Sequence, residues 1–314
     1  MMQTLGISIS FVVPVYRSAE SLPELHRRIV AAFGHLEIGF ELIFVEDCGG
    51  DRSWQVIQSL ALQDDRVRGF KMSRNYGQHN ALLCGIREAR GNVTVTLDDD
   101  LQHPPEEIHK LLHELNHGVD VVYGPPEQEQ HGILRDLASQ ISKLALQTAM
   151  GASNARSVSA LRVFKTRLRD GFAQYRSPNA NIDVLLTWSS SNFSSVRVSH
   201  DIRKFGKSGY TTRKLFLHAL NMMTGFSTRP LQLASFLGFS FAALGFIVLA
   251  YVLIGWILRG SAVPGFAFLA SMVAIFSGAQ MMALGIIGEY LARMHSRSME
   301  QPTYLVADKT DAVE

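Results

Sequence analysis

The stretch VTVTLDDDLQHPPEE, residues 93 to 107, runs from an alternating apolar strand into three consecutive aspartates and then into a helix opened by two prolines. Three carboxylates at the end of a buried strand repel one another unless a cation lies between them. Alternation along a strand points Asp98 and Asp100 to one side and Asp99 to the other. Mg²⁺ and Mn²⁺ prefer oxygen ligands together with substrate phosphates, so the stretch predicts a D-x-D pair that holds a metal ion on a diphosphate. A solvated acidic turn that caps the following helix is the alternative.

The segments around this stretch alternate between strand-like and helical patterns. Strand-like runs cover residues 7–15, 41–47, 67–72, 92–98 and 119–124, and helical patterns cover residues 21–33, 52–63, 77–90 and 105–117. Alternation at this spacing is typical of right-handed crossovers in a mostly parallel sheet. We therefore predict an α/β, Rossmann-like domain over residues 1–200. A dinucleotide site is the weaker interpretation, because no G-x-G-x-x-G motif follows the first strand.

The polar residues that follow the predicted strands mark one edge of this sheet. They are Pro14 and Tyr16 after the first strand, Glu46 and Asp47 after the second, Arg74 and Asn75 after the third, and Asp98 to Asp100 after the fourth. Ligands of open α/β sheets bind beyond the carboxyl ends of the strands. We therefore expect these side chains to line one binding site.

Two long segments near the C-terminus contain no Asp, Glu, Lys or Arg. They cover residues 231–258 and 260–288, with only Arg259 between them. Each exceeds the roughly 20 apolar residues that a helix needs to cross a bilayer. A buried helical hairpin of a soluble domain is the weaker interpretation, because core helices of that length usually carry a polar stripe. The predicted segments are a transmembrane helix at 231–258, a short extracytoplasmic turn at 259–265, a second transmembrane helix at 266–289 and a cytoplasmic tail at 290–314.

Basic residues flank the two apolar segments on their outer sides. Arg203, Lys204, Lys207, Arg213, Lys214 and Arg229 precede the first, and Arg293 and Arg297 follow the second. By the positive-inside rule, both termini are predicted to be cytoplasmic. The start of the chain has no basic residue and too short an apolar run for a signal peptide, and two cysteines fit a reducing cytosol. We predict a multi-pass protein of the cytoplasmic membrane, with a basic interfacial segment at 201–230.

The overall charge does not indicate a nucleic-acid partner. Charged residues make up 18 % of the 314-residue chain, and the formal net charge is only +2. Three glycines in the second apolar segment, Gly278, Gly285 and Gly288, would permit close helix packing and so a homo-oligomer.

Five motifs in this order resemble family-two glycosyltransferases. They are VPVY at 13–16, VEDCGGD at 45–51, SRNYGQHNALLCGI at 73–86, TLDDDLQHPPEEI at 96–108 and GIIGEYLARM at 285–294. The resemblance covers nearly the whole chain and is closest to the polyprenyl-phosphate glycosyltransferases, the group that includes dolichyl-phosphate mannosyltransferase and the bacterial undecaprenyl-phosphate glucosyl- and formamido-arabinosyltransferases. It implies a GT-A fold and an inverting transfer of a sugar from a nucleotide diphosphate to a lipid phosphate, for a lipid-linked sugar of the cell envelope.

The resemblance also implies roles for residues on the donor side. By position, Pro14, Tyr16 and Asp47 would lie around the nucleotide base, with Asp98 and Asp99 near the ribose and diphosphate and with Arg74 and Asn75 also in contact with substrate. Asp98, Asp100 and Gln102 match the family's metal-binding D-x-D-x-Q, for Mg²⁺ or Mn²⁺. A metal ion there would stabilise the charge that develops on the departing nucleoside diphosphate.

The acceptor side is expected in the stretch HDIRKFGKSGY, residues 200–210, which resembles the family's H-x-x-R-x-x-G-x-S-x-Y loop. Arg203 would act in catalysis by holding a phosphate, with Ser208 and Tyr210 binding substrate. Arg135 is a second candidate for the phosphate. A guanidinium suits this task because it donates two parallel charge-assisted hydrogen bonds. The alternative for these basic residues is attraction to anionic headgroups, worth about 1 kcal/mol each.

Three departures from the family pattern stand out. Tyr16 is followed by Arg-Ser rather than Asn-Glu, the second-strand motif reads E-D-C-G rather than D-D-G-S, and Arg156 falls about where relatives carry an aspartate that is a candidate base. A lipid phosphate is largely ionised near pH 7 and needs little deprotonation. Asp183 is a candidate base in place of that aspartate, or simply an acidic residue at a helix N-terminus.

Three functional hypotheses follow from the sequence. The leading one is a glycosyltransferase with a nucleotide-sugar donor and a polyprenyl-phosphate acceptor. A glycosyltransferase with another acceptor is the second, although a polysaccharide-forming enzyme would have more spans and a Q-x-x-R-W motif, and this chain has neither. A catalytically impaired membrane scaffold of the same fold is the third. Arg156 favours it, and the intact Asp98, Asp100 and Gln102 argue against it.

Overall fold

The computed structural model describes residues 9–35, 39–127, 158–178, 180–201, 229–259, 265–299 and 301–310. The chain divides into two compact units. The first joins residues 1–216 with residues 300–314, and the second covers residues 217–299. The return of the chain to the first unit after the second is the main feature that the sequence patterns did not predict.

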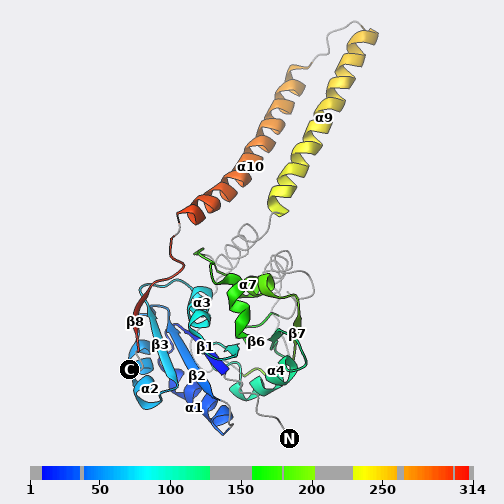
Figure 1. Cartoon of the computed structure of the whole chain (residues 1–314). Helices are drawn as coiled ribbons and strands as arrows, with labels where there is room; N and C mark the ends of the chain where they lie inside the picture. The colour runs from blue at the N-terminus through cyan, green and yellow to red at the C-terminus, as the bar shows by residue number, and fades with distance from the viewer. Residues whose placement is uncertain are drawn as a thin grey trace. The chain divides into compact units, whose positions relative to one another are not determined.

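The described part of the first unit is built on an eight-stranded sheet (Figure 1), in the order β7-β5-β6-β4-β1-β2-β3-β8. Its strands are β1 (Ile9–Val15), β2 (Phe40–Glu46), β3 (Val67–Met72), β4 (Val93–Thr96), β5 (Val121–Tyr123), β6 (Arg162–Lys165), β7 (Phe193–Ser195) and β8 (Val306–Lys309). The first four are mutually parallel, β6 is antiparallel to both β4 and β5, and β8 is antiparallel to β3. The predicted mostly parallel α/β fold is therefore confirmed.

Helices cover both faces of the sheet. They are α1 (Leu22–Phe33), α2 (Ser53–Gln63), α3 (Gln78–Glu88), α4 (Ile108–Leu115) and α7 (Ile182–Ser189), with short 3₁₀ turns at η1 (Pro105–Glu107) and η2 (Thr166–Phe172). Phe11 and Val13 of β1 pack with side chains of α1, α2 and α4, whereas Val12 packs with side chains of α3 and α7. All seven residues of β1 are buried, as expected of a strand covered on both sides.

The strand β4 ends at Thr96, two residues before the predicted end at residue 98. Its ladder with β1 stops where Thr96 lies opposite Val12, and the Leu97 N–H still donates to the Val12 carbonyl. The three aspartates therefore lie beyond the strand, with Asp99 and Asp100 in a turn. The predicted alternation of Asp98, Asp99 and Asp100 is accordingly wrong, since side-chain alternation holds only where the backbone stays extended.

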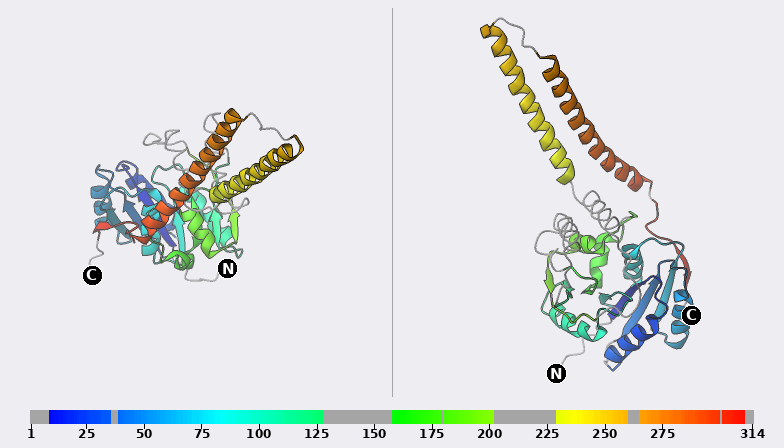
Figure 2. Two further views of the ribbon diagram at one scale, coloured as in Figure 1. Left: turned by 90° about the horizontal axis from the view of Figure 1, so that it is seen from above. Right: turned by 180° about the vertical axis from the view of Figure 1, so that it is seen from behind.

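Two long helices make up the described part of the second unit, α9 (Arg229–Arg259) and α10 (Phe266–Ser298). Figure 2 shows them running side by side as a hairpin. The rings of Phe241 and Phe276 meet across this pair at 5.8 Å, edge to face. Ala234–Gly255 and Ile275–Ala292 are long and apolar enough to cross a membrane, and large side chains such as Phe239 are left exposed. An exposed apolar surface of this length is unfavourable in water and is typical of helices that contact lipid.

The predicted tail at 290–314 has more structure than the sequence patterns indicated. Helix α10 continues to Ser298, past its predicted end at residue 289, and β8 then joins the sheet beside β3 (Figure 1). The pairs Phe70–Lys309, Lys71–Asp308 and Met72–Val306 define its register. The end of the chain is therefore an edge strand of the first unit.

Candidate active site

A cavity of about 220 Å³ opens at the carboxyl ends of the parallel strands. Its lining residues are Pro14, Val15, Tyr16, Asp47, Asn75, Gly77, Gln78, Asp98, Asp99 and Asp100. They come from the last residues of β1 and from the segments that follow β1, β2, β3 and β4, which meet because these four strands point the same way. The volume is smaller than the roughly 300–1,000 Å³ of a typical ligand pocket.

The loop after β1 ties Tyr16 to the aspartates. The Tyr16 side chain is 46 % exposed, and its backbone N–H donates to Asp99 Oδ2 at 3.1 Å. Arg17 lies 5.2 Å from the centre of the Tyr16 ring and donates through Nε to the Gly49 carbonyl at 2.8 Å. An exposed aromatic ring held at this position offers a flat surface on which a nucleotide base can stack.

Asp47, at the end of β2, fastens the loop that precedes α3. The residue is 3 % exposed, and its carboxylate accepts the backbone N–H groups of Tyr76 at 2.7 Å and Gly77 at 2.8 Å. Burial raises the pKa of Asp47 to about 6, although the two hydrogen bonds oppose this rise. Gly77 adopts a φ of 91°, a conformation that favours glycine, and so lets the chain turn into α3.

The three aspartates after β4 have different hydrogen-bond partners. Asp98 Oδ1 accepts from the Gln78 side chain at 2.7 Å, and Asp100 Oδ1 accepts the Gln102 backbone N–H at 3.1 Å. Asp100 is buried, at 7 % exposure. Burial raises the pKa of Asp99 to about 6, against hydrogen bonds that lower it. All three aspartates line the cavity, because the turn aims Asp99 at it as well.

Three residues other than glycine adopt left-handed backbone conformations near the cavity. They are Arg17 (φ 59°), Cys48 (φ 53°) and Leu101 (φ 62°), which directly follow Tyr16, Asp47 and Asp100. Each such residue costs about 1–3 kcal/mol, and such strain clusters at functional sites. The sequence carried no signal for it, since none of the three is Gly, Asn or Asp.

The donor set fits a hard divalent cation held together with a substrate. Asp98 and Asp100 supply carboxylate oxygens at the cavity, and Mg²⁺ is typically held by one or two carboxylates plus substrate phosphates. In the described part of the chain, no group of three or more His, Cys, Asp or Glu side chains gathers as a metal cage. Gln102 is not among the lining residues, so its place as a third ligand stays a prediction.

Asp183 lies in a buried ion pair. Its carboxylate is 3.2 Å from Arg162 Nε and accepts the Tyr123 hydroxyl at 3.1 Å, and both side chains of the ion pair are about 4 % exposed. The pair joins β5, β6 and the first turn of α7, whose N-cap is Asn181. Asp183 is not among the cavity-lining residues. Its role as a base stays a prediction, and the ion pair favours a structural role.

The start of the predicted acceptor loop lies beside the aspartate stretch. The Asp201 N–H donates to the Gln102 carbonyl at 2.9 Å, and the His200 ring lies 5.0 Å from the His103 ring, edge to face. Burial lowers the pKa of His103 to about 4, so this imidazole is neutral at pH 7. Two motifs about a hundred residues apart in sequence are thus adjacent in the fold.

Seven of the predicted site residues line the cavity: Pro14, Tyr16, Asp47, Asn75, Asp98, Asp99 and Asp100. Arg74 is not among them, and its guanidinium lies over the Tyr76 ring at 4.7 Å. Arg135, Arg203, Ser208 and Tyr210, like Arg156, lie outside the described residues. The sequence reasoning missed Val15, Gly77 and Gln78. A Gly-Gln pair at a loop-to-helix junction after a strand was the available signal for the last two.

The comparisons with known proteins agree with this geometry. Residues 10–170 match the model of glycosyl transferase family 2, and the chain is similar over nearly its whole length to curated transferases. The chain belongs to glycosyl transferase family 2. The glycosyltransferase is 34 % identical to the undecaprenyl-phosphate 4-deoxy-4-formamido-L-arabinose transferase of Pseudomonas fluorescens SBW25, over 95 % of this chain and 88 % of the relative. The enzyme of the same name from Pseudomonas aeruginosa LESB58 is also 34 % identical, over 95 % and 89 %.

A solved structure supports the fold of this glycosyltransferase. The glucosyl-3-phosphoglycerate synthase of Mycobacterium tuberculosis superimposes with a TM-score of 0.52 over 70 % of this chain and 79 % of that chain, at 14 % sequence identity. The fold of the first unit is accordingly GT-A-like, as the motifs predicted.

The raised pKa of Asp47 predicts a pH-dependent contribution to stability. Its value of about 6 in the folded state exceeds the ordinary 3.8, so the folded protein binds this proton more tightly than the unfolded chain. This contribution is present below about pH 4 and is lost as the pH rises to about 6. Asp47→Asn removes the titration. The melting temperature of the variant, relative to wild type in EDTA and without nucleotide, should therefore rise between pH 4 and pH 7. A difference that stays constant over this range would contradict the assignment.

Proposed function

We propose that this glycosyltransferase moves a sugar from a nucleotide-diphosphate sugar to a polyprenyl phosphate, with inversion at the anomeric carbon. The observation that carries the proposal is the convergence of Tyr16, Asp47 and the three aspartates on one cavity. The similarity to undecaprenyl-phosphate sugar transferases over 95 % of the chain supports the acceptor class. The product would be a lipid-linked sugar for the cell envelope.

The cavity suggests how the donor binds. The exposed Tyr16 ring stacks on the base, with Pro14 and Asp47 beside it, and Asn75 and Asp99 face the sugar-phosphate part. In the transfer, the bond between the anomeric carbon and the diphosphate oxygen breaks as an acceptor oxygen bonds from the opposite face. A Mg²⁺ or Mn²⁺ ion held by Asp98 and Asp100 would stabilise the charge left on the nucleoside diphosphate.

The acceptor is proposed to bind in the segment that begins at His200. The contact between Asp201 and Gln102 brings the start of this segment to the aspartate stretch. From there Arg203, Ser208 and Tyr210, together with Arg135, would hold the lipid phosphate. No side chain needs to remove a proton, because a phosphate monoester with a second pKa of about 6 is already largely a dianion at pH 7.

The proposed location is the cytoplasmic membrane, with α9 and α10 as the two spans. The pairing of β8 with β3 supports a hairpin that leaves and re-enters the first unit on one side. The excess of Lys and Arg outside the apolar segments supports a cytoplasmic first unit. The donor, a water-soluble nucleotide sugar, would then be available on the same side.

The metal assignment predicts a large effect of one carboxylate. Asp100→Asn keeps the acceptor for the Gln102 N–H but removes a charged ligand, so turnover should fall by roughly two or more orders of magnitude without loss of folding. Turnover with Mn²⁺, Mg²⁺ or EDTA is measured beside Asp65→Asn, an exposed carboxylate at the other end of the sheet, which should match wild type. Full activity in EDTA would overturn the assignment.

A mechanism without a protein base predicts that turnover depends more on the Arg203 guanidinium than on the Asp183 carboxylate. Arg203→Ala should lower turnover far more than Asp183→Asn, which keeps one acceptor oxygen for Tyr123 but removes the charge that pairs with Arg162. The rate of the wild type should rise with pH through the second ionisation of the phosphate, near about 6. Lys204→Ala, a neighbouring cation, is the control and should have a small effect. A crippled Asp183→Asn enzyme that melts at the wild-type temperature, beside a nearly normal Arg203→Ala enzyme, would favour a protein base.

The hairpin topology predicts opposite labelling of two cysteines. A membrane-impermeant maleimide should label Ser261→Cys from outside in spheroplasts, whereas the native, exposed Cys48 should be labelled only in inverted vesicles. Cys48 thus serves as the internal control for membrane integrity. Labelling of position 261 in inverted vesicles alone would show that the turn is cytoplasmic.

A further inference from the structure

The last described residues of the chain, 301–310, contact the part of the first unit that carries the donor cavity. We call them the C-terminal segment. The Leu305 carbonyl accepts the Ser73 N–H at 2.9 Å, at the first residue of the loop 73–77. Tyr304 packs on the same apolar cluster as Tyr76, and its ring lies 5.6 Å from the Arg87 guanidinium near the end of α3. The segment therefore meets both the loop before α3 and the helix itself.

That loop and helix supply one wall of the cavity. Asn75, Gly77 and Gln78 line it, and Gln78 donates to the carboxylate of Asp98. Asp47 holds the loop from the cavity side through the Tyr76 and Gly77 N–H groups. On the opposite side the loop is held where β8 begins. The loop is therefore held from both sides, in addition to the Asn80 side chain of α3, which donates to the Tyr76 carbonyl at 2.7 Å. The attachment to Leu305 lies outside the donor site itself.

The other end of the C-terminal segment is anchored far along the sheet, toward the amino end of β3. The Thr310 hydroxyl accepts the Gly69 N–H at 2.6 Å, and Trp54 donates to Asp308 at 3.2 Å. Because β8 is antiparallel to β3, Leu305 lies beside the carboxyl end of β3, and residues 308–310 lie further from that end.

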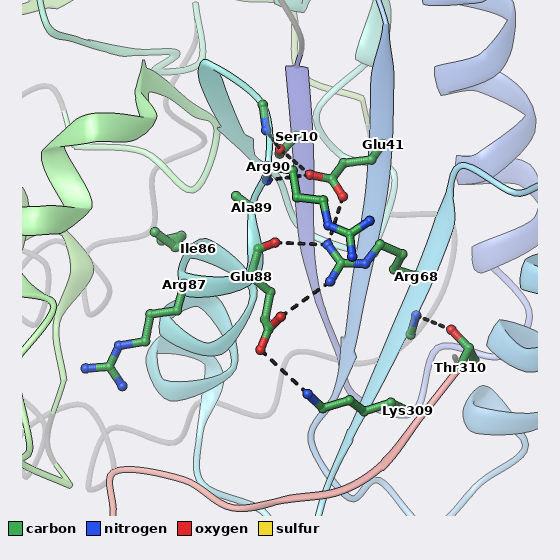
Figure 3. Close-up of polar contacts among 12 residues, drawn as sticks. Ser10, Glu41, Arg68, Ile86, Arg87, Glu88, Ala89, Arg90, Lys309 and Thr310 are labelled. Atoms are coloured by element: carbon green, nitrogen blue, oxygen red, sulfur yellow. Dashed lines mark hydrogen bonds and ion pairs between the residues drawn. The ribbon is translucent and has the colours of Figure 1, made fainter. Parts of the chain in front are cut away.

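A row of ion pairs connects Lys309 of this segment with side chains of the neighbouring strands (Figure 3). Lys309 lies 3.7 Å from Glu88, Arg68 joins Glu88 at 3.3 Å and Glu41 at 2.9 Å, and Ser10 donates to Glu41 at 2.7 Å. Arg68 and Glu41 are largely buried, so this row is less screened by solvent than a surface ion pair. The segment is thus fastened at one end and meets the donor loop at the other.

We propose that the C-terminal segment is a positioning element of the donor cavity, with Tyr304 as a positioning residue for the loop 73–77. The segment follows directly on α10, so the affinity for donor depends on the part of the chain that leaves the second apolar helix. The proposal rests on the proposed function, because it assumes that the cavity binds a nucleoside diphosphate. It assigns to the start of the segment, around Tyr304, a role in binding that is separate from the contribution of residues 308–310 to stability.

The test compares two substitutions at opposite ends of the segment, in the full chain in detergent. The affinity for UDP and for GDP, each with Mn²⁺, is measured by calorimetry beside the melting temperature. Tyr304→Ala should raise the Kd of the nucleotide that binds by about tenfold. Tyr304→Phe, which keeps the ring, should restore it. Thr310→Val removes the acceptor for Gly69 and should lower the melting temperature while leaving the Kd unchanged.

If the wild type binds nucleotide and Tyr304→Ala binds equally well, or if Thr310→Val weakens binding as much as Tyr304→Ala does, the positioning role is overturned and the proposed function stands. A wild-type protein that binds no nucleoside diphosphate with Mn²⁺ overturns both.

Discussion

Parallel pairing of β1 with β2 and β4 is the constraint on which the site depends. In this register Val15 lies opposite Glu46 and Val12 lies opposite Thr96, so the three strands end at one edge. Each helical crossover returns the chain to the opposite edge before the next strand begins, and the loops that follow the strands therefore meet. In this way the Tyr16 N–H reaches a carboxylate 83 residues further along the chain. The sheet, more than any local motif, makes a site out of residues from four separate segments.

The site is assembled at a cost in stability. Asp47 and Asp100 are buried, the pKa values of Asp47 and Asp99 are raised, and three residues that are not glycine take left-handed conformations around the cavity. Backbone N–H groups offset part of this cost, notably the two that donate to Asp47. The remainder fits a site whose charges are completed by a cation and a diphosphate, since a site organised before the substrate arrives need not rearrange during the reaction.

After the second unit, the chain returns to the first unit and adds β8 to the edge of its sheet. Strand β8 covers the edge of β3 and is itself exposed along most of its length, with Lys309 among its residues. A charged, short edge strand discourages pairing with another sheet. Leu305, directly before this strand, accepts the Ser73 N–H of the loop before α3, so one segment both protects the sheet edge and contacts a loop that lines the donor cavity.

The sequence by itself determined the alternation of strands and helices, the two apolar helices and seven of the cavity residues. These features follow from local periodicity, from apolar runs of sufficient length and from motifs whose spacing is local. Only the tertiary structure decided the direction of Asp99, because the ladder with β1 stops at Thr96 and the chain then turns. It likewise decided the ion pair of Asp183 with Arg162 and the pairing of β8 with β3. These depend on hydrogen bonds and charges between segments far apart in the chain, and no periodicity within one segment specifies its partner.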